Sequence, residues 1–241
     1  MIVYGINAVI EALRSGRATT VRVSKRSDER MRALLALAHE QGASIRRVEQ
    51  GELDRIVPGG VHQGVVADVK GAREYDIEDL VREAPPPALL VVLDGVEDPH
   101  NVGAILRTVD AAGAHGVIRQ TRHSAALGSA ASKASAGAIA HVRIANVVNI
   151  ARAVEELKAL GVWTVGLAGD APAAIGKIDL TMPVALVLGA EGEGLRRLVR
   201  ERCDFLAKIP IFGHVDSLNV SVAAGVALFE AVRQRGLSPQ S

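Results

Sequence analysis

The feature that most constrains the fold is the alternation of short apolar runs with longer amphipathic segments beyond residue 88. The first run, LLVVLDG at residues 89–95, is apolar without interruption until it ends in Asp-Gly. Such a run is typical of a strand that is buried on both faces of a parallel sheet. We predict further strands at residues 115–118, 162–168, 183–189 and 206–211.

Helix-like segments separate most of these strands. They cover residues 101–113, 149–161, 194–203 and 218–235, and an Ala/Ser-rich helix is expected over 129–140. Strands that alternate with helices of this length predict an α/β fold with an open, mainly parallel sheet. Because ligands bind beyond the carboxyl ends of the strands in such sheets, the loops there are the first place to look for a site.

The first seventy residues predict a smaller α/β unit. Its helices are expected over 7–16, with Asn7 as N-cap, and over 28–42; its strands are expected at 19–24, 43–49 and 63–70. A charged segment follows that carries Pro85, Pro86 and Pro87, which stiffen the chain. We therefore predict an N-terminal domain over 1–70, a linker over 71–87 and a second domain over 88–241.

Composition places the chain among globular proteins, with 49% apolar and 23% charged residues among 241. No apolar stretch approaches the roughly 20 residues that span a bilayer, and the N-terminus lacks the pattern of a secretory leader. We therefore expect a cytoplasmic protein without a membrane partner. The only cysteine, Cys203, cannot form an internal disulfide or a zinc framework, and we expect a buried structural thiol rather than a nucleophile.

The charge pattern is consistent with an RNA partner but does not require one. Net charge is +1, and basic clusters at residues 22–26 and 45–48 are either phosphate contacts or solvated surface. Only six aromatic residues occur (one Trp, two Tyr, three Phe), which argues against a base-stacking platform of the kind that single-strand binders use.

A glycine-rich loop follows the predicted strand at 183–189. Its glycines, Gly189, Gly192 and Gly194, are spaced G-x-x-G-x-G, which is the wrong order and place for a dinucleotide fingerprint, and no P-loop Lys follows. The loop either brings backbone and Glu191 close to a ligand or is a plain turn between strand and helix.

Two helical segments present polar residues beside apolar stripes. In the first, Val102, Ile105, Leu106 and Val109 share a stripe and Arg107 projects from the opposite side, so core packing does not explain that arginine. Asn101 at the start of this helix is either an N-cap or a functional residue.

The second segment is an amphipathic helix that ends near Gly236. Its apolar positions at helical spacing are Leu218, Val222, Val226, Phe229 and Val232. Ser217 and Asn219 lie at its N-terminus, where free N–H groups favour an electron-rich ligand or where the two residues act only as caps.

Taken together and in this order, the segments NVGAILRT, LVLGAEGEGLRR and IPIFGHVDSLNVSVAAGVALFEAVRQ resemble the three motifs of the SpoU (TrmH) family of RNA 2'-O-ribose methyltransferases, in the SPOUT superfamily. YGINAV, VHQGVVADV and LDGVEDPHNVGA further resemble the bacterial 23S rRNA (guanosine-2'-O-)-methyltransferase branch of that family. The resemblance covers nearly the whole chain.

The resemblance implies a fold, a cofactor and partners that spacing alone does not. It implies a C-terminal domain with a deep trefoil knot that binds S-adenosylmethionine, a homodimer, and an N-terminal domain that helps select RNA, with 23S rRNA as the expected partner and no DNA. By position, it assigns catalytic roles to Asn101, Arg107, Glu191, Ser217 and Asn219. It assigns cofactor binding to the backbone of Gly189, Ile209 and Leu218.

Elementary chemistry refines these roles. A guanidinium is a poor base, so we expect Arg107 to bind phosphate and stabilise the developing alkoxide, with a phosphate or a water as base. Glu191 is the alternative general base, but the family pattern favours it as an organiser of the loop. No metal is expected, since the histidines, His100 and His214 among them, show no paired ligand spacing.

Three other functions compete with this interpretation. A non-catalytic RNA-binding assembly factor does not need all five polar residues of the motifs. A nicotinamide oxidoreductase conflicts with the G-x-x-G-x-G order of the glycines in the loop. A tRNA 2'-O-ribose methyltransferase is the nearest alternative. Such relatives usually lack the N-terminal domain and carry basic extensions, whereas the last residues here are GLSPQS, which favours ribosomal RNA.

Overall fold

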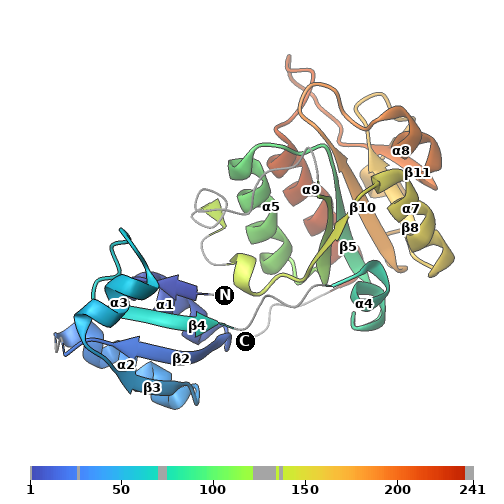
Figure 1. The fold of residues 1–241 in the computed structure, drawn as a ribbon. Coiled ribbons are helices and arrows are strands. Elements are labelled where there is room, and N and C mark those ends of the chain that lie inside the picture. The colour runs from blue at the N-terminus through green and yellow to red at the C-terminus, as the bar shows by residue number, and fades with distance from the viewer. Residues whose placement is uncertain (1, 26–27, 70–74, 122–133, 136–137, 237–241) are drawn as a thin grey trace. The chain divides into compact units, whose positions relative to one another are not determined.

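The structure is a computed structural model that describes residues 2–25, 28–69, 75–121, 134–135 and 138–236. The chain divides into two compact units, Met1–Arg73 and Glu74–Ser241 (Figure 1). Each unit combines helices with a sheet, so the predicted α/β class is confirmed.

The first unit is built on a four-stranded mixed sheet in the order β1-β4-β2-β3. Strand β4 pairs antiparallel with β1 and β2, and β2 pairs parallel with β3. Its elements are β1 (Ile2–Tyr4), α1 (Ile6–Arg14), β2 (Ala18–Val23), α2 (Glu29–Glu40), β3 (Ser44–Arg47), α3 (Gln50–Ile56) and β4 (Val65–Val69).

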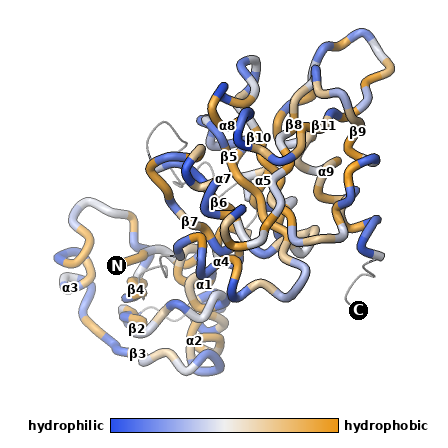
Figure 2. Tube along the Cα trace, turned by 90° about the vertical axis from the view of Figure 1, so that its right-hand side faces the viewer, coloured by the Kyte–Doolittle hydropathy of each residue, from blue (hydrophilic) through white to orange (hydrophobic). Residues whose placement is uncertain are grey.

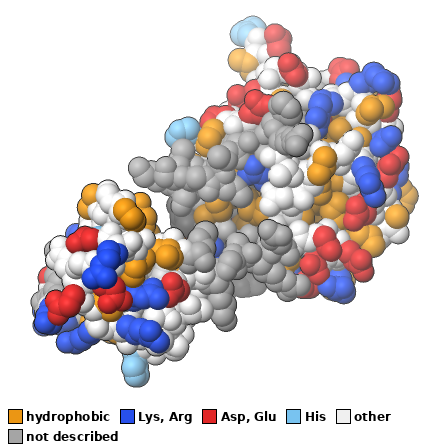
Figure 3. Space-filling view, in the orientation of Figure 1, with side chains coloured by type: hydrophobic (Ala, Val, Ile, Leu, Met, Phe, Trp, Pro, Cys, Tyr) orange, Lys and Arg blue, Asp and Glu red, His pale blue; other side chains and the backbone are white. Residues whose placement is uncertain are grey.

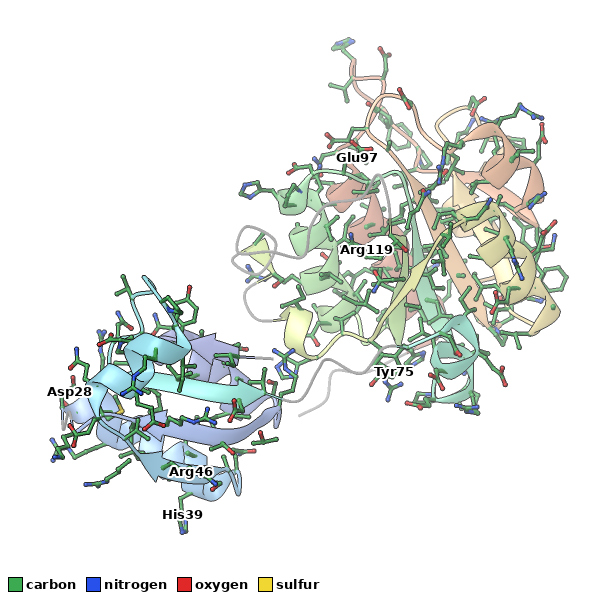
Figure 4. All side chains as sticks on the ribbon, viewed as in Figure 1. Asp28, His39, Arg46, Tyr75, Glu97 and Arg119 are labelled. Carbon is green, nitrogen blue, oxygen red and sulfur yellow. The ribbon has the colours of Figure 1, made fainter. Side chains whose placement is uncertain are left out.

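Successive residues along a strand of this unit face opposite sides of the sheet, and helices cover both sides. Val65 of β4 packs in the core with α1 and α2, whereas its neighbour Val66 packs with α3. Asp28, labelled in Figure 4, caps α2 by accepting a hydrogen bond from the Met31 N–H at 2.9 Å, as the predicted helix start requires. The predicted cap of α1 is wrong, because Gly5, with φ of 87°, is the N-cap and Asn7 lies inside the helix.

The second unit is built on a seven-stranded sheet in the order β7-β6-β5-β10-β8-β11-β9, and every strand pair in it is parallel. The strands are β5 (Leu89–Asp94), β6 (Gly116–Gln120), β7 (Ile144–Val147), β8 (Trp163–Leu167), β9 (Ala173–Ala174), β10 (Val184–Gly189) and β11 (Phe205–Lys208). The helices are α4 (Ile77–Arg82), α5 (Pro99–Ala111), α7 (Ile150–Ala159), α8 (Arg197–Arg202) and α9 (Val220–Gln234), with short 3-10 turns η1 (Ala138–Ala140) and η2 (Ile175–Lys177).

Helices cover both faces of this sheet (Figure 1). Residues of β5 alternate between the two cores: Leu89 and Val91 pack with α5 and α9, whereas Leu90 packs with α4, α7 and α8. Figure 2 shows the resulting hydrophobic colour along β5 and β10. Burial on both faces explains why these strands are unbroken apolar runs.

The segment before β5 differs from the expected linker over 71–87. Tyr75, labelled in Figure 4, forms an isolated parallel bridge with Ala145, and α4 buries Ile77 and Leu80 in the core of the second unit. The apolar spacing of this short helix explains its packing, because Ile77 and Leu80 are three residues apart and share one face. The Ala/Ser-rich helix expected over 129–140 lies largely outside the described residues.

Candidate active site

A cavity of about 500 Å³ lies at the carboxyl ends of β8, β10 and β11. Three stretches of chain form most of its wall: residues 167–170 at the end of β8, residues 188–195 at the end of β10, and residues 207–220 from the end of β11 to the start of α9, of which all but five line the cavity. The site therefore occupies the position that an open parallel sheet gives to a ligand.

Gly189, Ile209 and Leu218 all line this cavity. They come from two different loops and are brought together by the order of the strands, because β10 and β11 both flank β8. Backbone groups that converge on one cavity from separate loops can bind the polar edges of an adenine-like ring while apolar side chains enclose it.

The loop after β10 requires its glycines. A Cβ on Gly189 would lie 2.1 Å from the carbonyl carbon of Gly194, so the returning loop leaves no room for a side chain. Two backbone hydrogen bonds between Ala190 and Gly194, of 3.1 and 2.9 Å, close the loop, which places Glu191 at its outer turn.

Asn219 connects three elements at the edge of the cavity. Its Nδ2 donates to Oδ1 of Asn101 at 3.0 Å and to Oε1 of Glu191 at 2.5 Å. Its Oδ1 accepts from the N–H of Ser221 at 2.9 Å and so caps α9. The helix start of α5, the glycine loop and the helix start of α9 are thereby joined through one amide.

Asn101 contributes to this network and is not a helix cap. Helix α5 begins two residues earlier than predicted, with Asp98 as the N-cap and Pro99 in its first turn. The Asn101 side chain is buried inside the first turns, which frees its amide oxygen to accept from Asn219. Ser217 lines the cavity and lies on its exposed rim.

Arg107 is the one assigned residue that does not join this arrangement among the described side chains. It lies on the exposed side of α5, opposite the buried stripe, as the helical pattern predicts. It is absent from the residues that line the cavity. The chain thus brings Asn101, Glu191, Ser217 and Asn219 to one place and leaves Arg107 outside it.

Asp170 and Arg200 also line the cavity and were not predicted. The Arg200 guanidinium donates two hydrogen bonds to the Asp170 carboxylate, at 2.8 and 2.9 Å, and lowers the pKa of Asp170 below its usual value. Asp170 follows the carboxyl end of β8, and ligands bind beyond the carboxyl ends of strands in open parallel sheets. This rule could have identified Asp170 from the sequence.

Cys203 takes no part in this chemistry. Its Sγ donates to the carbonyl of Val199 at 3.3 Å, and burial raises the pKa of the thiol to about 12. The thiolate that a nucleophile needs is therefore suppressed. Within the described ranges, no cluster of three or more His, Cys, Asp or Glu side chains is placed to hold a metal ion.

Two family models match the chain. The SpoU rRNA Methylase family matches residues 88–229, and a model described as RNA 2'-O ribose methyltransferase substrate binding matches residues 2–75. The chain is 48% identical over 239 residues to the 23S rRNA (guanosine-2'-O-)-methyltransferase RlmB of Pseudomonas putida, covering 97% of this chain and 96% of that protein. It is 46% identical to RlmB of Escherichia coli, over 97% and 98% of the two chains.

A solved structure supports the same grouping. The SpoU methyltransferase AviRb from Streptomyces viridochromogenes in complex with AdoMet matches with a TM-score of 0.73 and 28% identity, covering 98% of this chain and 90% of that chain. The parallel α/β fold, its cavity and these matches define an RNA methyltransferase with a separate substrate-binding domain. The resemblance found in the three motifs is confirmed: this chain belongs to the SpoU rRNA methylase family.

Proposed function

We propose that this protein transfers a methyl group from S-adenosylmethionine to the 2'-hydroxyl of a guanosine in 23S rRNA. The observation that carries the proposal is the convergence of Gly189, Ile209 and Leu218 on one cavity whose edge is organised by Asn219. The relatives named for this reaction match the chain over nearly its whole length, which supports the choice of substrate.

The cavity suits a cofactor of this size and chemistry. Pockets for small ligands measure about 300–1,000 Å³, and this one measures about 500 Å³. Gly189 presents backbone without a side chain, and Ile209 and Leu218 supply apolar surface beside it. Bound S-adenosylmethionine supplies an electrophilic methyl group.

The chain's own residues then align and stabilise the reactants. In-line transfer needs the ribose hydroxyl held opposite the sulfonium, and Ser217, Asn219 and Glu191 line the cavity edge where that hydroxyl would approach. Because Oε1 of Glu191 accepts from Asn219, we assign Glu191 to organising the loop. Arg107 does not line the cavity of its own chain, so we assign it to binding RNA phosphate and stabilising the alkoxide at the cavity of a second copy, while a phosphate or a water accepts the proton.

We also propose a homodimer, supported by an exposed apolar stripe on α9. Val222, Val226 and Phe229 expose 51, 41 and 50% of their surface, and they follow one another at helical spacing. A contiguous exposed stripe of this kind is typical of a protein interface. A second copy packed on α9 would lie next to α5, which packs beside α9 and carries Arg107.

The N-terminal unit is assigned to RNA recognition, because the substrate-binding model covers residues 2–75. The face of that unit in Figure 3 carries acidic and basic side chains close together rather than one basic patch, so we expect recognition by shape more than by charge.

We assign the larger unit to the trefoil-knotted methyltransferase domain, which the non-sequential strand order β5-β10-β8-β11 supports. The proposed rRNA substrate places the reaction in the cytoplasm. No helix in the described part of the chain is long and apolar enough to cross a membrane.

The test uses labelled S-adenosylmethionine and total RNA from a strain that lacks the gene. We expect label at a single guanosine ribose of 23S rRNA. Label only in tRNA would overturn the substrate assignment in favour of the nearest alternative, and the absence of transfer to any RNA would favour a non-catalytic assembly factor.

A further inference from the structure

Asp94 is a fully buried carboxylate that the proposed chemistry does not use. Its side chain is 0% exposed at the carboxyl end of β5, directly beside the strand that leads into the glycine loop. In the parallel register, Asp94 is paired with Gly189, the last residue of β10. A buried charge of this kind is unstable unless it is paired and hydrogen-bonded.

Arg196 satisfies both oxygens of Asp94. Its backbone N–H donates to Oδ2 at 2.8 Å and its Nε donates to Oδ1 at 2.6 Å, and its Nη2 forms an ion pair with Oδ1. The Nη2 group also donates to Oε1 of Gln120, at the end of β6, at 2.8 Å. These contacts fix both the backbone and the side chain of Arg196 at the ends of two strands.

The two ends of the glycine loop therefore meet at one residue. Gly189 enters the loop beside Asp94, and Arg196 leaves the loop bonded to Asp94. The loop between them forms one wall of the cavity and carries Glu191 to Asn219. With its ends fixed and its middle closed by the Ala190–Gly194 pair, the loop is held in shape before a ligand arrives.

We propose that Asp94 is a positioning residue whose ion pair with Arg196 holds the glycine loop in the conformation that binds the adenosine portion of the cofactor. This inference rests on the proposed function, because it needs a nucleoside ligand in the cavity. It acts through the loop and touches neither reactant. Loss of the pair consequently weakens cofactor binding more than it slows transfer at saturating cofactor.

The experiment measures the affinity of the full chain for S-adenosylhomocysteine by calorimetry, without RNA. Asp94→Asn keeps the side-chain shape and removes the charge, and the released Arg196, 47% exposed, stays solvated. We expect the dissociation constant to rise about tenfold, equivalent to about 1.4 kcal/mol. The matched control is Arg197→Gln, which breaks the neighbouring exposed pair with Glu201 outside the cavity and leaves the affinity unchanged.

Further measurements separate positioning from simple stabilisation. For Asp94→Asn we expect a raised KM for the cofactor and a kcat within about twofold of the wild-type value. The double variant, Asp94→Asn with Arg196→Gln, should bind the cofactor no more weakly than the weaker-binding single variant. If Asp94→Asn does not fold, Arg196→Lys provides the affinity test, because it keeps a cation beside the buried Asp94 and removes the guanidinium that fixes the side chain at the ends of two strands. A lower melting temperature with wild-type affinity in the folded variant overturns the positioning role. Absence of binding by the wild type overturns the proposed function instead.

Discussion

Helices α5 and α9 pack side by side on one face of the sheet, yet they direct their large apolar side chains differently (Figure 1). The stripe of α5, made of Val102, Ile105, Leu106 and Val109, is at most 1% exposed. The stripe of α9, made of Val222, Val226 and Phe229, is 41 to 51% exposed. Both helices are amphipathic, but α9 leaves this stripe of bulky side chains uncovered by its own chain, whereas α5 buries its stripe.

The buried face of α9 consists mainly of small residues. Ala224, Ala227 and Ala231 are fully buried with Leu228 against the sheet and α5, while the bulky stripe faces outward. At Gly225 a Cβ would make an ordinary van der Waals contact, 3.7 Å from Cγ2 of Thr108, so α5 lies next to this face of α9. Apolar periodicity thus identifies a face that packs, but not whether the partner belongs to the same chain.

The largest expected effect concerns Arg107, on the exposed side of α5. Arg107→Ala should lower kcat by about 10²–10³-fold, because a cation that stabilises developing charge acts mainly in the transition state. The free energy of unfolding should change by less than about 0.5 kcal/mol, because Arg107 is exposed. Methyl transfer at saturating cofactor and RNA measures the effect, and Arg152→Ala on the exposed side of α7 is the control. Unchanged turnover would remove Arg107 from the chemistry.

The preceding residue along α5, Leu106, should give the opposite result. Leu106→Ala leaves a cavity in a fully buried position and should lower the free energy of unfolding by about 2–5 kcal/mol. Urea denaturation followed by circular dichroism measures it. Val226→Ala, from the exposed stripe of α9, is the matched comparison and should cost less than about 1 kcal/mol at concentrations where the chain is monomeric. Equal losses would mean that the two stripes are buried alike.

A third variant tests what covers the stripe of α9. Phe229→Ala should weaken self-association by about 2 kcal/mol, because a large aromatic side chain at the centre of an interface contributes strongly. Sedimentation equilibrium measures the dissociation constant. Leu198→Ala removes an equally exposed apolar side chain from α8, on the other face of the sheet, and should leave association unchanged. A wild-type chain that remains monomeric at high concentration contradicts the proposed dimer.

The two helices also show how far sequence reasoning reaches. Strands β5 and β10 were predicted within a residue, because burial on both faces demands an unbroken apolar run. The short strands β7 and β9 were not predicted, since their few residues carry no clear period. Helix α9 was predicted with nearly its observed bounds, but its orientation depends on packing that no periodicity encodes.

The residues of the site show the same limit. Motifs singled out Asn101, Glu191 and Asn219, which lie at helix starts or in the glycine loop, but not the hydrogen bonds that join them. The ion pair between Asp94 and Arg196 joins residues 102 positions apart and forms because β5 lies beside β10. Strand order of this kind cannot be read from local patterns, so pairs that depend on it were missed.

The smallest expected effect concerns the ends of the two helices rather than their stripes. His115, just after α5, accepts a hydrogen bond at Nδ1 from the Leu89 N–H at 3.0 Å. Burial, followed by the nearby charges of Arg235 and Arg143, lowers the pKa of His115 below its usual value of 6.5. Arg235 caps α9 and donates to the carbonyl of Ala88 at 3.0 Å, so the ends of both helices meet at the start of β5.

This lowered pKa gives stability a definite dependence on pH. Below about pH 6.5 the unfolded chain binds a proton that the folded chain resists, so His115 stabilises the fold above that value and its contribution is lost as pH falls toward the folded pKa. The melting temperature of the wild type should therefore fall more between about pH 7.5 and about pH 5.5 than that of His115→Asn, whose amide oxygen can still accept from Leu89. Parallel pH profiles for the two proteins would show that protonation of His115 does not change the stability of the fold at the junction of the helix ends.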